Sequence, residues 1–348
     1  MTARRFHTAL LAALVAGALY PGAPSHVRAA GFDVTEFYTG KTITFIIGSQ
    51  NATYARIIGR HMVKYVPGNP SMKFSKMAGR GSQDAAAAIT RLAPGDGLAI
   101  AALLPEAIMA PLVGAPDKKR PYNPLDLVYL GSASNSTYVC IGDSDAPAQS
   151  FEQALERPMI MGASAAGGSA RDSTLMLMNL LGARFKLVDG YRDRAQVLKA
   201  LEHGEVQGLC GYSWTRLKRQ RFDLVAENKV KLLLQFGLDA NPELTKLGVP
   251  SVWKFVKNDR DRAALGLLAS SLVFSRPFVA SPGTPRAQVN ALRVAFERTM
   301  RDVDFRSDAH KNQLTIAPTT GEALQRLIKK IFKTPADIVS RAREARKG

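Results

Sequence analysis

Short apolar runs alternate with helical patterns along most of the chain. Ile43–Ile47 is almost continuously apolar, as expected of a strand buried on both faces of a parallel sheet. After it, apolar residues recur at spacings of three and four from Tyr54 to Tyr65, which indicates an amphipathic helix. Later strands are likewise followed by helices of the length that a right-handed crossover needs. The pattern therefore predicts an α/β fold.

The alternation continues to the end of the chain and divides it into two lobes. Lobe 1 is predicted at 30–135 and 272–348, and lobe 2 at 136–271, with strands crossing between them near Tyr129–Ile141 and Val273–Val279. Other predicted strands are Met72–Ser75, Leu98–Leu103, Met159–Met161, Phe185–Val188, Glu205–Cys210, Val230–Phe236 and Leu314–Ala317. Predicted helices in the second half are Asp259–Leu268, Thr320–Phe332 and Pro335–Arg346.

Residues 1–29 have the pattern of a signal peptide. Arg4 and Arg5 form a basic start, Ala9–Leu19 is an apolar run too short to span a bilayer, and small or modest residues precede a cut near Ala29. The residues flanking the arginine pair favour the general secretory route over the twin-arginine route. No later segment reaches eighteen uncharged apolar residues, so the sequence predicts an exported, soluble mature protein.

The chain has 348 residues and a formal net charge of +18, which permits nucleic acid, an anionic membrane surface or acidic small molecules as partners. The basic residues are scattered, however, and few are interleaved with aromatic residues. A solvated basic surface explains the charge equally well, and export argues against nucleic acid.

The two cysteines, Cys140 and Cys210, both occupy apolar, strand-like segments. Their separation excludes a CxxC redox motif, which leaves one disulfide or two buried thiols. The sequence favours the disulfide slightly, because both segments are predicted strands of the same lobe.

The stretch Gly162–Asp172 reads G-A-S-A-A-G-G-S-A-R-D and lies between a predicted strand and a predicted helix. The first N–H groups of a helix have no intrahelical partner, and glycine lets backbone approach a ligand closely, so this junction is a candidate anion site. The competing interpretation is a flexible turn with an N-cap serine.

Motifs for chemistry are missing. No G-x-S-x-G elbow, H-E-x-x-H helix or Walker loop occurs, and His61, His203 and His310 are far apart in the sequence. We therefore expect no catalytic residue, no metal site and no cofactor.

Six motifs in order make the chain similar to a known family. They are F-Y-T-G-K-T-I-T-F-I-I-G at Phe37–Gly48, A-P-G-D-G at Ala93–Gly97, the junction at Gly162, G-E-V-Q-G-L-C-G-Y-S-W at Gly204–Trp214, R-P-F-V-A-S-P-G-T-P at Arg276–Pro285, and T-P-A-D-I-V-S-R-A-R-E-A at Thr334–Ala345. Over nearly all of the mature chain, the sequence resembles the extracytoplasmic solute receptors of tripartite tricarboxylate transporters, which are type II periplasmic binding proteins.

The resemblance implies a periplasmic, two-lobed clamp, each lobe a mainly parallel sheet flanked by helices. Such a receptor, expected as a monomer, closes on a small organic acid and presents it to membrane permease subunits, without catalysis. Family members hold the ligand with backbone N–H groups, hydroxyls and waters more than with paired charges. The candidate ligand-binding residues here are Ser49, Gln50, Asn51, Thr53, Arg80, Gly81, Ser82, Ser164, Gly167, Gly168, Ser169, Arg171, Asp172, Tyr191, Tyr212 and Trp214.

Some of these assignments have a structural alternative. Arg80 and Arg171 are the candidates for pairing with a carboxylate, yet Arg171 is equally explained by a bridge to Asp172 or to solvent. Tyr212 and Trp214 are assigned to the cleft wall or, as readily, to core packing.

The loop between Gly48 and Tyr54 departs from the family pattern. It is several residues shorter and lacks the glycines and the acidic residue found there in family members. Each unmet polar group of a ligand costs on the order of 1–3 kcal/mol, which is enough to weaken binding or change the ligand class. A sensing or interaction module with a lost or altered transport role is therefore the alternative function.

Overall fold

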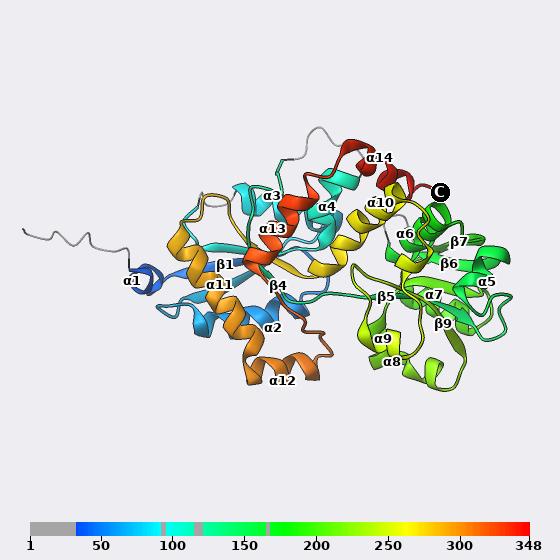
Figure 1. The fold of residues 1–348 in the computed structure, drawn as a ribbon. Helices are drawn as coiled ribbons and strands as arrows, with labels where there is room; N and C mark the ends of the chain where they lie inside the picture. The colour runs from blue at the N-terminus through cyan, green and yellow to red at the C-terminus, as the bar shows by residue number, and fades with distance from the viewer. Residues whose placement is uncertain (1–32, 92–94, 115–120, 165–167) are drawn as a thin grey trace, which may run out of the picture. The chain divides into compact units, whose positions relative to one another are not determined.

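The computed structural model describes residues 33–91, 95–114, 121–164 and 168–348. Val34–Gly348 forms one compact unit that contains two separate sheets, shown in Figure 1. The predicted signal peptide lies outside the described residues. Within the described part of the chain, no helix combines the length and the apolar character needed to cross a membrane.

The first sheet has six strands in the order β11-β4-β10-β3-β1-β2. Strand β1 pairs in parallel with β2 and β3, whereas β10 runs antiparallel between β3 and β4. Its strands are β1 (Thr42–Ile47), β2 (Ser71–Lys76), β3 (Ala99–Ala102), β4 (Val128–Ser132), β10 (Pro277–Ala280) and β11 (Thr319–Thr320).

The second sheet has five strands in the order β7-β6-β8-β5-β9 and repeats the same plan. Strand β6 pairs in parallel with β7 and β8, and β5 runs antiparallel between β8 and β9. Its strands are β5 (Tyr138–Asp143), β6 (Met159–Ser164), β7 (Phe185–Tyr191), β8 (Gly208–Ser213) and β9 (Val230–Phe236). Both sheets are therefore mixed. In each sheet, the antiparallel strand (β10 in the first, β5 in the second) directly follows a segment of chain that passes from one sheet to the other.

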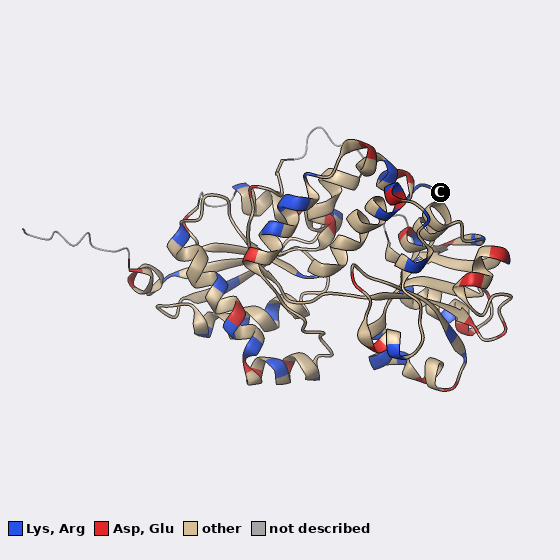
Figure 2. Ribbon diagram, in the orientation of Figure 1, with Lys and Arg blue, Asp and Glu red and all other residues tan. Residues whose placement is uncertain are grey.

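The helices connect and cover these strands. They are α1 (Val34–Tyr38), α2 (Thr53–Met62), α3 (Gln83–Arg91), α4 (Pro105–Val113), α5 (Phe151–Glu156), α6 (Ser169–Met176), α7 (Arg194–Glu202), α8 (Trp214–Ala226), α9 (Pro242–Lys246), α10 (Asp259–Ala269), α11 (Arg286–Arg301), α12 (Val303–Lys311), α13 (Gly321–Ile331) and α14 (Ala336–Glu344). Figure 2 shows that their basic residues are distributed over helices of both lobes.

Strand β1 is central to the first lobe. Ile43, Phe45 and Ile47 contribute to one buried cluster, and Ile46 contributes to another. Because neighbouring side chains of a strand point to opposite faces, a strand with buried apolar residues on both faces contributes to two cores. The near-continuous apolar run predicted this burial.

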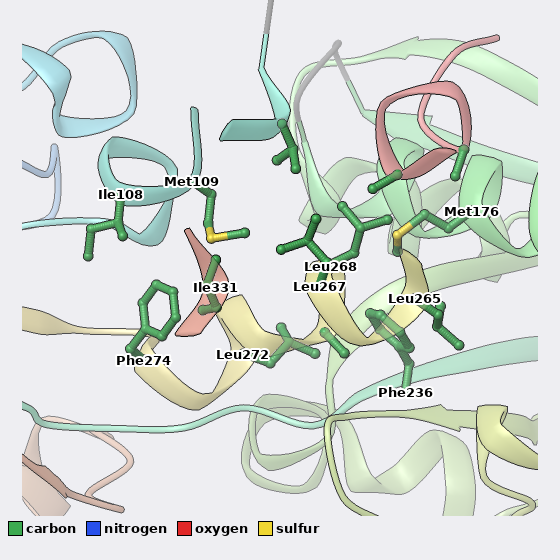
Figure 3. Close-up of a cluster of buried hydrophobic side chains, with 14 of the residues drawn as sticks. Ile108, Met109, Met176, Phe236, Leu265, Leu267, Leu268, Leu272, Phe274 and Ile331 are labelled. Carbon is green, nitrogen blue, oxygen red and sulfur yellow. The ribbon is translucent and has the colours of Figure 1, made fainter. Parts of the chain in front are cut away.

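One hydrophobic cluster extends over helices from both lobes. Figure 3 shows Met109 of α4, Leu268 of α10 and Met176 of α6 among its members. Helix α14 packs on α10 (Figure 1), and Val339 and Ala342 of α14 belong to the same cluster. The core thus continues past the boundary between the two sheets.

Two strand predictions were wrong. At Leu314–Ala317 there is no strand, because the N–H of Leu314 bonds to Ala309 O and that of Thr315 bonds to the Tyr54 hydroxyl. The start of Val273–Val279 is helical, since a 3₁₀ helix covers Ser270–Phe274 before β10. Serine hydroxyls in this segment bond to carbonyls three residues earlier, which favours the helical turn.

Cys140 of β5 and Cys210 of β8 are joined in a disulfide between neighbouring antiparallel strands. Both residues are buried, and 70 positions of sequence separate them. The bond lies directly before Gly211, whose carbonyl belongs to the candidate site described below.

Reducing this disulfide is expected to lower the free energy of unfolding by about 4 kcal/mol, because a cross-link over so long a loop restricts the unfolded chain. Denaturant unfolding of the wild type with and without reductant measures the effect. A Cys140→Ala, Cys210→Ala double variant serves as the control and should not respond to reductant. Identical wild-type midpoints in both conditions would contradict a stabilising cross-link.

Candidate functional site

The candidate site lies where the parallel strands of each lobe end. Strands β1, β2 and β3 end at one edge of the first sheet, and β6, β7 and β8 end at one edge of the second. Open α/β sheets bind ligands in the crevice beyond the carboxyl ends of such strands. Ligand-binding groups are therefore expected on the loops that follow these strands.

Ser82 connects three of these loops in the first lobe. Its fully buried hydroxyl donates to Gly48 O at 2.9 Å and accepts from the N–H of Leu104 at 3.0 Å. Gly48 must lack a side chain, because a Cβ there would come within 2.6 Å of Ser82 Oγ. Ser82 thus fixes the loops after β1, β2 and β3 against one another and has no hydroxyl proton left for a ligand.

The backbone around Ser82 is unusual. Arg80, Gly81 and Ser82 have φ values of 41°, 64° and 71°, so three consecutive residues lie in the left-handed region. This conformation costs roughly 1–2 kcal/mol for each non-glycine residue, and the buried Ser82 bonds hold it in place. The Arg80 guanidinium bonds to Asp84 of α3, with Nε 2.9 Å from Oδ1, so its charge is matched within the lobe.

Several polar groups of the short loop after β1 are hydrogen-bonded to other groups of the same loop. Ser49 Oγ donates to Asn51 O at 2.7 Å, and Asn51 Oδ1 accepts from the N–H of Thr53 at 2.9 Å. These bonds shape the turn that begins α2, whose N-cap Ala52 provides no side-chain cap. Gln50 is exposed on this loop, and Thr53 is half-buried.

The second-lobe junction contains an unpartnered hydroxyl. Ser164 ends β6 with 5% of its surface exposed, and among the described residues its Oγ has no hydrogen-bond partner. A buried hydroxyl without a partner destabilises the fold by about 1–3 kcal/mol, so a ligand or water that satisfies it is favoured. Gly167 lies outside the described residues, and Gly168 is the N-cap of α6 without a side-chain cap.

Ser169 at the start of α6 belongs to a three-residue cluster. Its Oγ donates to Gly211 O at 3.1 Å, and Arg194 Nη1 donates to both Ser169 Oγ and Gly211 O, at 2.9 and 3.2 Å. Gly211 has φ +71°, and a Cβ there would collide with the Ser169 carbonyl. The cluster joins the first residues of α6 and α7 to strand β8.

Arg194 was missed by the sequence analysis. It is the first residue of α7, directly after its N-cap Asp193 and shortly after β7 ends. This position could have identified Arg194 from the sequence, because the first helical turn after a parallel strand lies at the edge of the sheet where ligands bind.

The two charged residues of the Gly162 stretch pair with other parts of the protein. Arg171 Nε lies 3.3 Å from Asp189 Oδ1. Arg171 therefore pairs with Asp189, and the bridge from Arg171 to Asp172 that the sequence offered as one alternative does not form. Asp172 accepts from Arg346 Nε at 3.0 Å.

The aromatic candidates contribute largely to packing. Tyr212 and Trp214 are buried in the core of the second lobe, and Trp214 Nε1 donates to Glu243 Oε2 at 3.0 Å. Tyr191 is half-buried at the end of β7, and its hydroxyl donates to Glu205 at 3.2 Å. Desolvation raises the pKa of Tyr191 and of Tyr212, so both hydroxyls stay neutral.

Two cavities in the described part of the chain are lined by residues other than Ser169, Arg194 and Gly211. One, of about 290 Å³, is lined by Asp143, Glu202 and Arg221. Asp143 ends the antiparallel strand β5, so this cavity lies at the opposite edge of the second sheet. The other, of about 180 Å³, is lined by residues 135–137 of the chain crossing, by residues 237–242 after β9, and by Leu272 and Val273. In the described ranges, no group of three His, Cys, Asp or Glu residues could hold a metal ion.

The C-terminal segment is hydrogen-bonded to α6 and to the helical turn that follows α6. Besides bonding to Asp172, Arg346 donates to Val113 O at 3.5 Å, at the end of α4. Asn179 Nδ2 donates to Ala345 O at 3.1 Å and to Lys347 O at 2.8 Å. The segment therefore links α4 of the first lobe to the helix that begins at the candidate anion site.

Comparison with known proteins gives the fold. No protein-family model and no curated protein sequence matches this chain. A TctC solute-binding protein from Polaromonas, solved without ligand, is 17% identical with a TM-score of 0.65, over 84% of this chain and 96% of that one. The chain has the two-lobed fold of such solute-binding proteins, as the resemblance predicted.

Two further neighbours were solved with ligands. MatC from Rhodopseudomonas palustris, with bound malate, is 18% identical with a TM-score of 0.56, over 88% of this chain and 99% of that one. Another R. palustris protein, with adipate, is 17% identical with a TM-score of 0.58, over 87% and 97%.

Removing the Arg346 side chain is expected to lower the free energy of unfolding by about 1–3 kcal/mol, because the partly buried carboxylate of Asp172 loses a charged hydrogen-bond partner. Chemical denaturation of Arg346→Ala, Asp172→Asn and the double variant measures the coupling. Arg192→Ala is the control, since this side chain is 80% exposed and should change stability by less than about 0.5 kcal/mol. Additive single effects would show that the pair contributes no coupling.

Proposed function

We propose that this protein is an exported receptor that binds a small organic carboxylate between its two lobes and delivers it to a tripartite tricarboxylate-type permease. The observation that carries the proposal is the junction between β6 and α6, where the unpartnered hydroxyl of Ser164 precedes a helix N-terminus without a side-chain cap. The malate and adipate bound by two proteins of the same fold support a carboxylate as the ligand. The protein acts in the periplasm after removal of residues 1–29.

The second lobe contributes most of the hydrogen bonds to the ligand in this proposal. The first N–H groups of α6 attract an anion, because they lack intrahelical partners and lie at the positive end of the helix dipole. Ser164 Oγ adds a donor, and Arg194 adds positive charge beside Ser169. Arg171 and Asp172 stay engaged with Asp189 and Arg346 and therefore orient α6.

The first lobe closes over the ligand from the loops after β1 and β2. Gln50 and Thr53 are available there, whereas Ser49 and Asn51 first have to hold the turn. Bound ligand favours the closed arrangement only to the extent that it binds that arrangement more tightly than the open one. No step changes a covalent bond, so we propose a receptor rather than an enzyme.

Calorimetry against succinate, malate, adipate, citrate, butyrate, hexanoate and several amino acids is expected to identify at least one carboxylate ligand. Ser164→Ala and Ser169→Ala should each weaken its binding about 5- to 100-fold, because the first removes a donor near the bound anion and the second removes the hydroxyl that holds Arg194 beside it.

Ser340→Ala is the matched control, since this exposed hydroxyl only contacts Glu344 of its own helix. Thermal melting of each variant separates lost binding from lost folding. Absence of binding to every panel compound at millimolar concentration contradicts the receptor proposal. Unchanged affinity in both folded serine variants would place the site elsewhere.

A further inference from the structure

A third connection between the lobes lies in and after the last turn of α14. The chain reaches α14 through α13, which packs on β4 of the first sheet, and α14 packs on α10 of the second lobe (Figure 1). The other two connections are the crossings that lead into β5 and β10. Residues 341–347 therefore lie where they can contact helices of both lobes.

Arg343 and Arg346 bind the end of helix α4 in the first lobe. Arg343 Nε and Nη2 donate to Leu112 O at 3.0 and 2.6 Å. Arg346 Nη1 donates to Val113 O at 3.5 Å. The last carbonyls of a helix have no intrahelical N–H partner and lie at the negative end of the helix dipole. Two guanidinium groups therefore stabilise this helix end and attach the segment to the first lobe.

Arg346 also binds the second lobe. Its Nε and Nη2 donate to Asp172 Oδ2 at 3.0 and 2.5 Å, and Asp172 lies in the first turn of α6. The side chains of Arg346 and Asp172 are 27% and 17% exposed, so solvent screens their attraction less than that of a surface pair. One guanidinium group thus joins the start of α6 to the end of α4.

The backbone on both sides of Arg346 is held by the second lobe. Asn179, in the helical turn after α6, donates through Nδ2 to Ala345 O at 3.1 Å and to Lys347 O at 2.8 Å. Arg341 Nη2 donates to Asn179 O at 2.8 Å, which attaches the same turn to α14. Because its backbone is anchored, the Arg346 side chain loses little further freedom when it bridges α4 and α6.

The two helices that Arg346 joins both begin at the carboxyl edge of a sheet. Helix α6 starts at Ser169, and its first N–H groups belong to the proposed anion site. Asp172 is three residues further along, so it occupies a neighbouring position on the helix surface. Helix α4 starts directly after Leu104, whose N–H donates to the Ser82 hydroxyl at 3.0 Å. A change in the distance between α4 and α6 would therefore also move the loops that face the ligand.

We propose that Arg346 is a positioning residue for ligand binding, which acts by holding α4 and α6 together before the ligand arrives. Arg343 supports it through its bonds to the end of α4. When the lobes are already held in this arrangement, a larger fraction of the protein is competent to bind, and the apparent affinity rises. The arrangement of the ligand-free lobes goes beyond the proposed function, whereas the effect on affinity rests on that function.

Pulsed electron paramagnetic resonance on the ligand-free protein tests the arrangement. Spin labels on Lys199→Cys in α7 and Ser307→Cys in α12 report the distance between the lobes, since both positions are exposed and the native cysteines are joined in a disulfide. We expect one narrow distance distribution in the labelled protein without further changes. Arg346→Ala and Asp172→Asn should each broaden it, because each breaks the bridge between α4 and α6.

Arg293→Ala is the matched control. Like Arg346, Arg293 donates to a backbone carbonyl and to a carboxylate, with Nε 3.0 Å from Tyr129 O and Nη1 2.7 Å from Glu322 Oε1, but both partners belong to the first lobe. Its loss should lower the melting temperature without changing the distance between the labels. Arg346→Lys should restore part of the narrow distribution, because the ammonium group keeps a positive charge opposite Asp172.

Calorimetry with malate, adipate and the other acids of the panel above tests the effect on the ligand site. For an acid that the wild type binds, Arg346→Ala should raise the Kd by about 3- to 30-fold, because fewer molecules are in the competent arrangement. Arg293→Ala should change the Kd by less than about twofold. A merely structural role of Arg346 would instead give equal changes in the two variants.

Thermal melting checks that each variant is folded at the temperature of the measurements. Identical distance distributions in the ligand-free wild type and in folded Arg346→Ala overturn the inference, and so does a broadened distribution with an unchanged Kd. If the wild type binds none of the panel acids, the receptor proposal and the effect on affinity both fail, whereas the distances still decide whether Arg346 holds the lobes.

Discussion

The close approach of α6 to β8 at Gly211 is the contact on which the candidate site depends. It brings Ser169 and Arg194 onto one carbonyl, and it requires a residue without a side chain in a left-handed conformation. The Cys140–Cys210 disulfide fixes the strand directly before that glycine. Cross-link, glycine and helix start therefore act together to place the uncapped N-terminus of α6 at the edge of the sheet.

The two lobes share an architecture, but the buried serines at the carboxyl edges of their sheets differ in their hydrogen bonding. In the first lobe, both hydrogen bonds of the Ser82 hydroxyl are made to the loops after β1 and β3 and hold them in place. In the second, Ser164 is buried and unpartnered within the described part of the chain. Buried polar groups are normally satisfied, so this difference supports a structural role for Ser82 and the proposed ligand-binding role for Ser164.

Charge in this protein is matched unevenly. Arg171, Asp172 and Arg346 form pairs that tie α6 to β7 and to the C-terminal segment. Arg216, Arg219 and Arg276 have no such carboxylate among the described residues, and they lie where the two sheets present their loops. Many other basic side chains of the described residues, such as Arg56 and Arg286, also have no carboxylate within 4.0 Å, so a high net charge does not by itself locate an anion site.

The sequence by itself predicted most of the strands and many of the helices in their correct order, because burial on two faces and helical periodicity leave direct patterns in the chain. Val230–Phe236 was predicted with the bounds the structure has. Leu314–Ala317 failed because its N–H groups bond to a helix end and to Tyr54, far away in sequence. Likewise, only the tertiary structure paired Arg171 with Asp189 and brought Arg194 to Ser169. A side chain's partner depends on which loops meet at a sheet edge, and local periodicity carries no record of that.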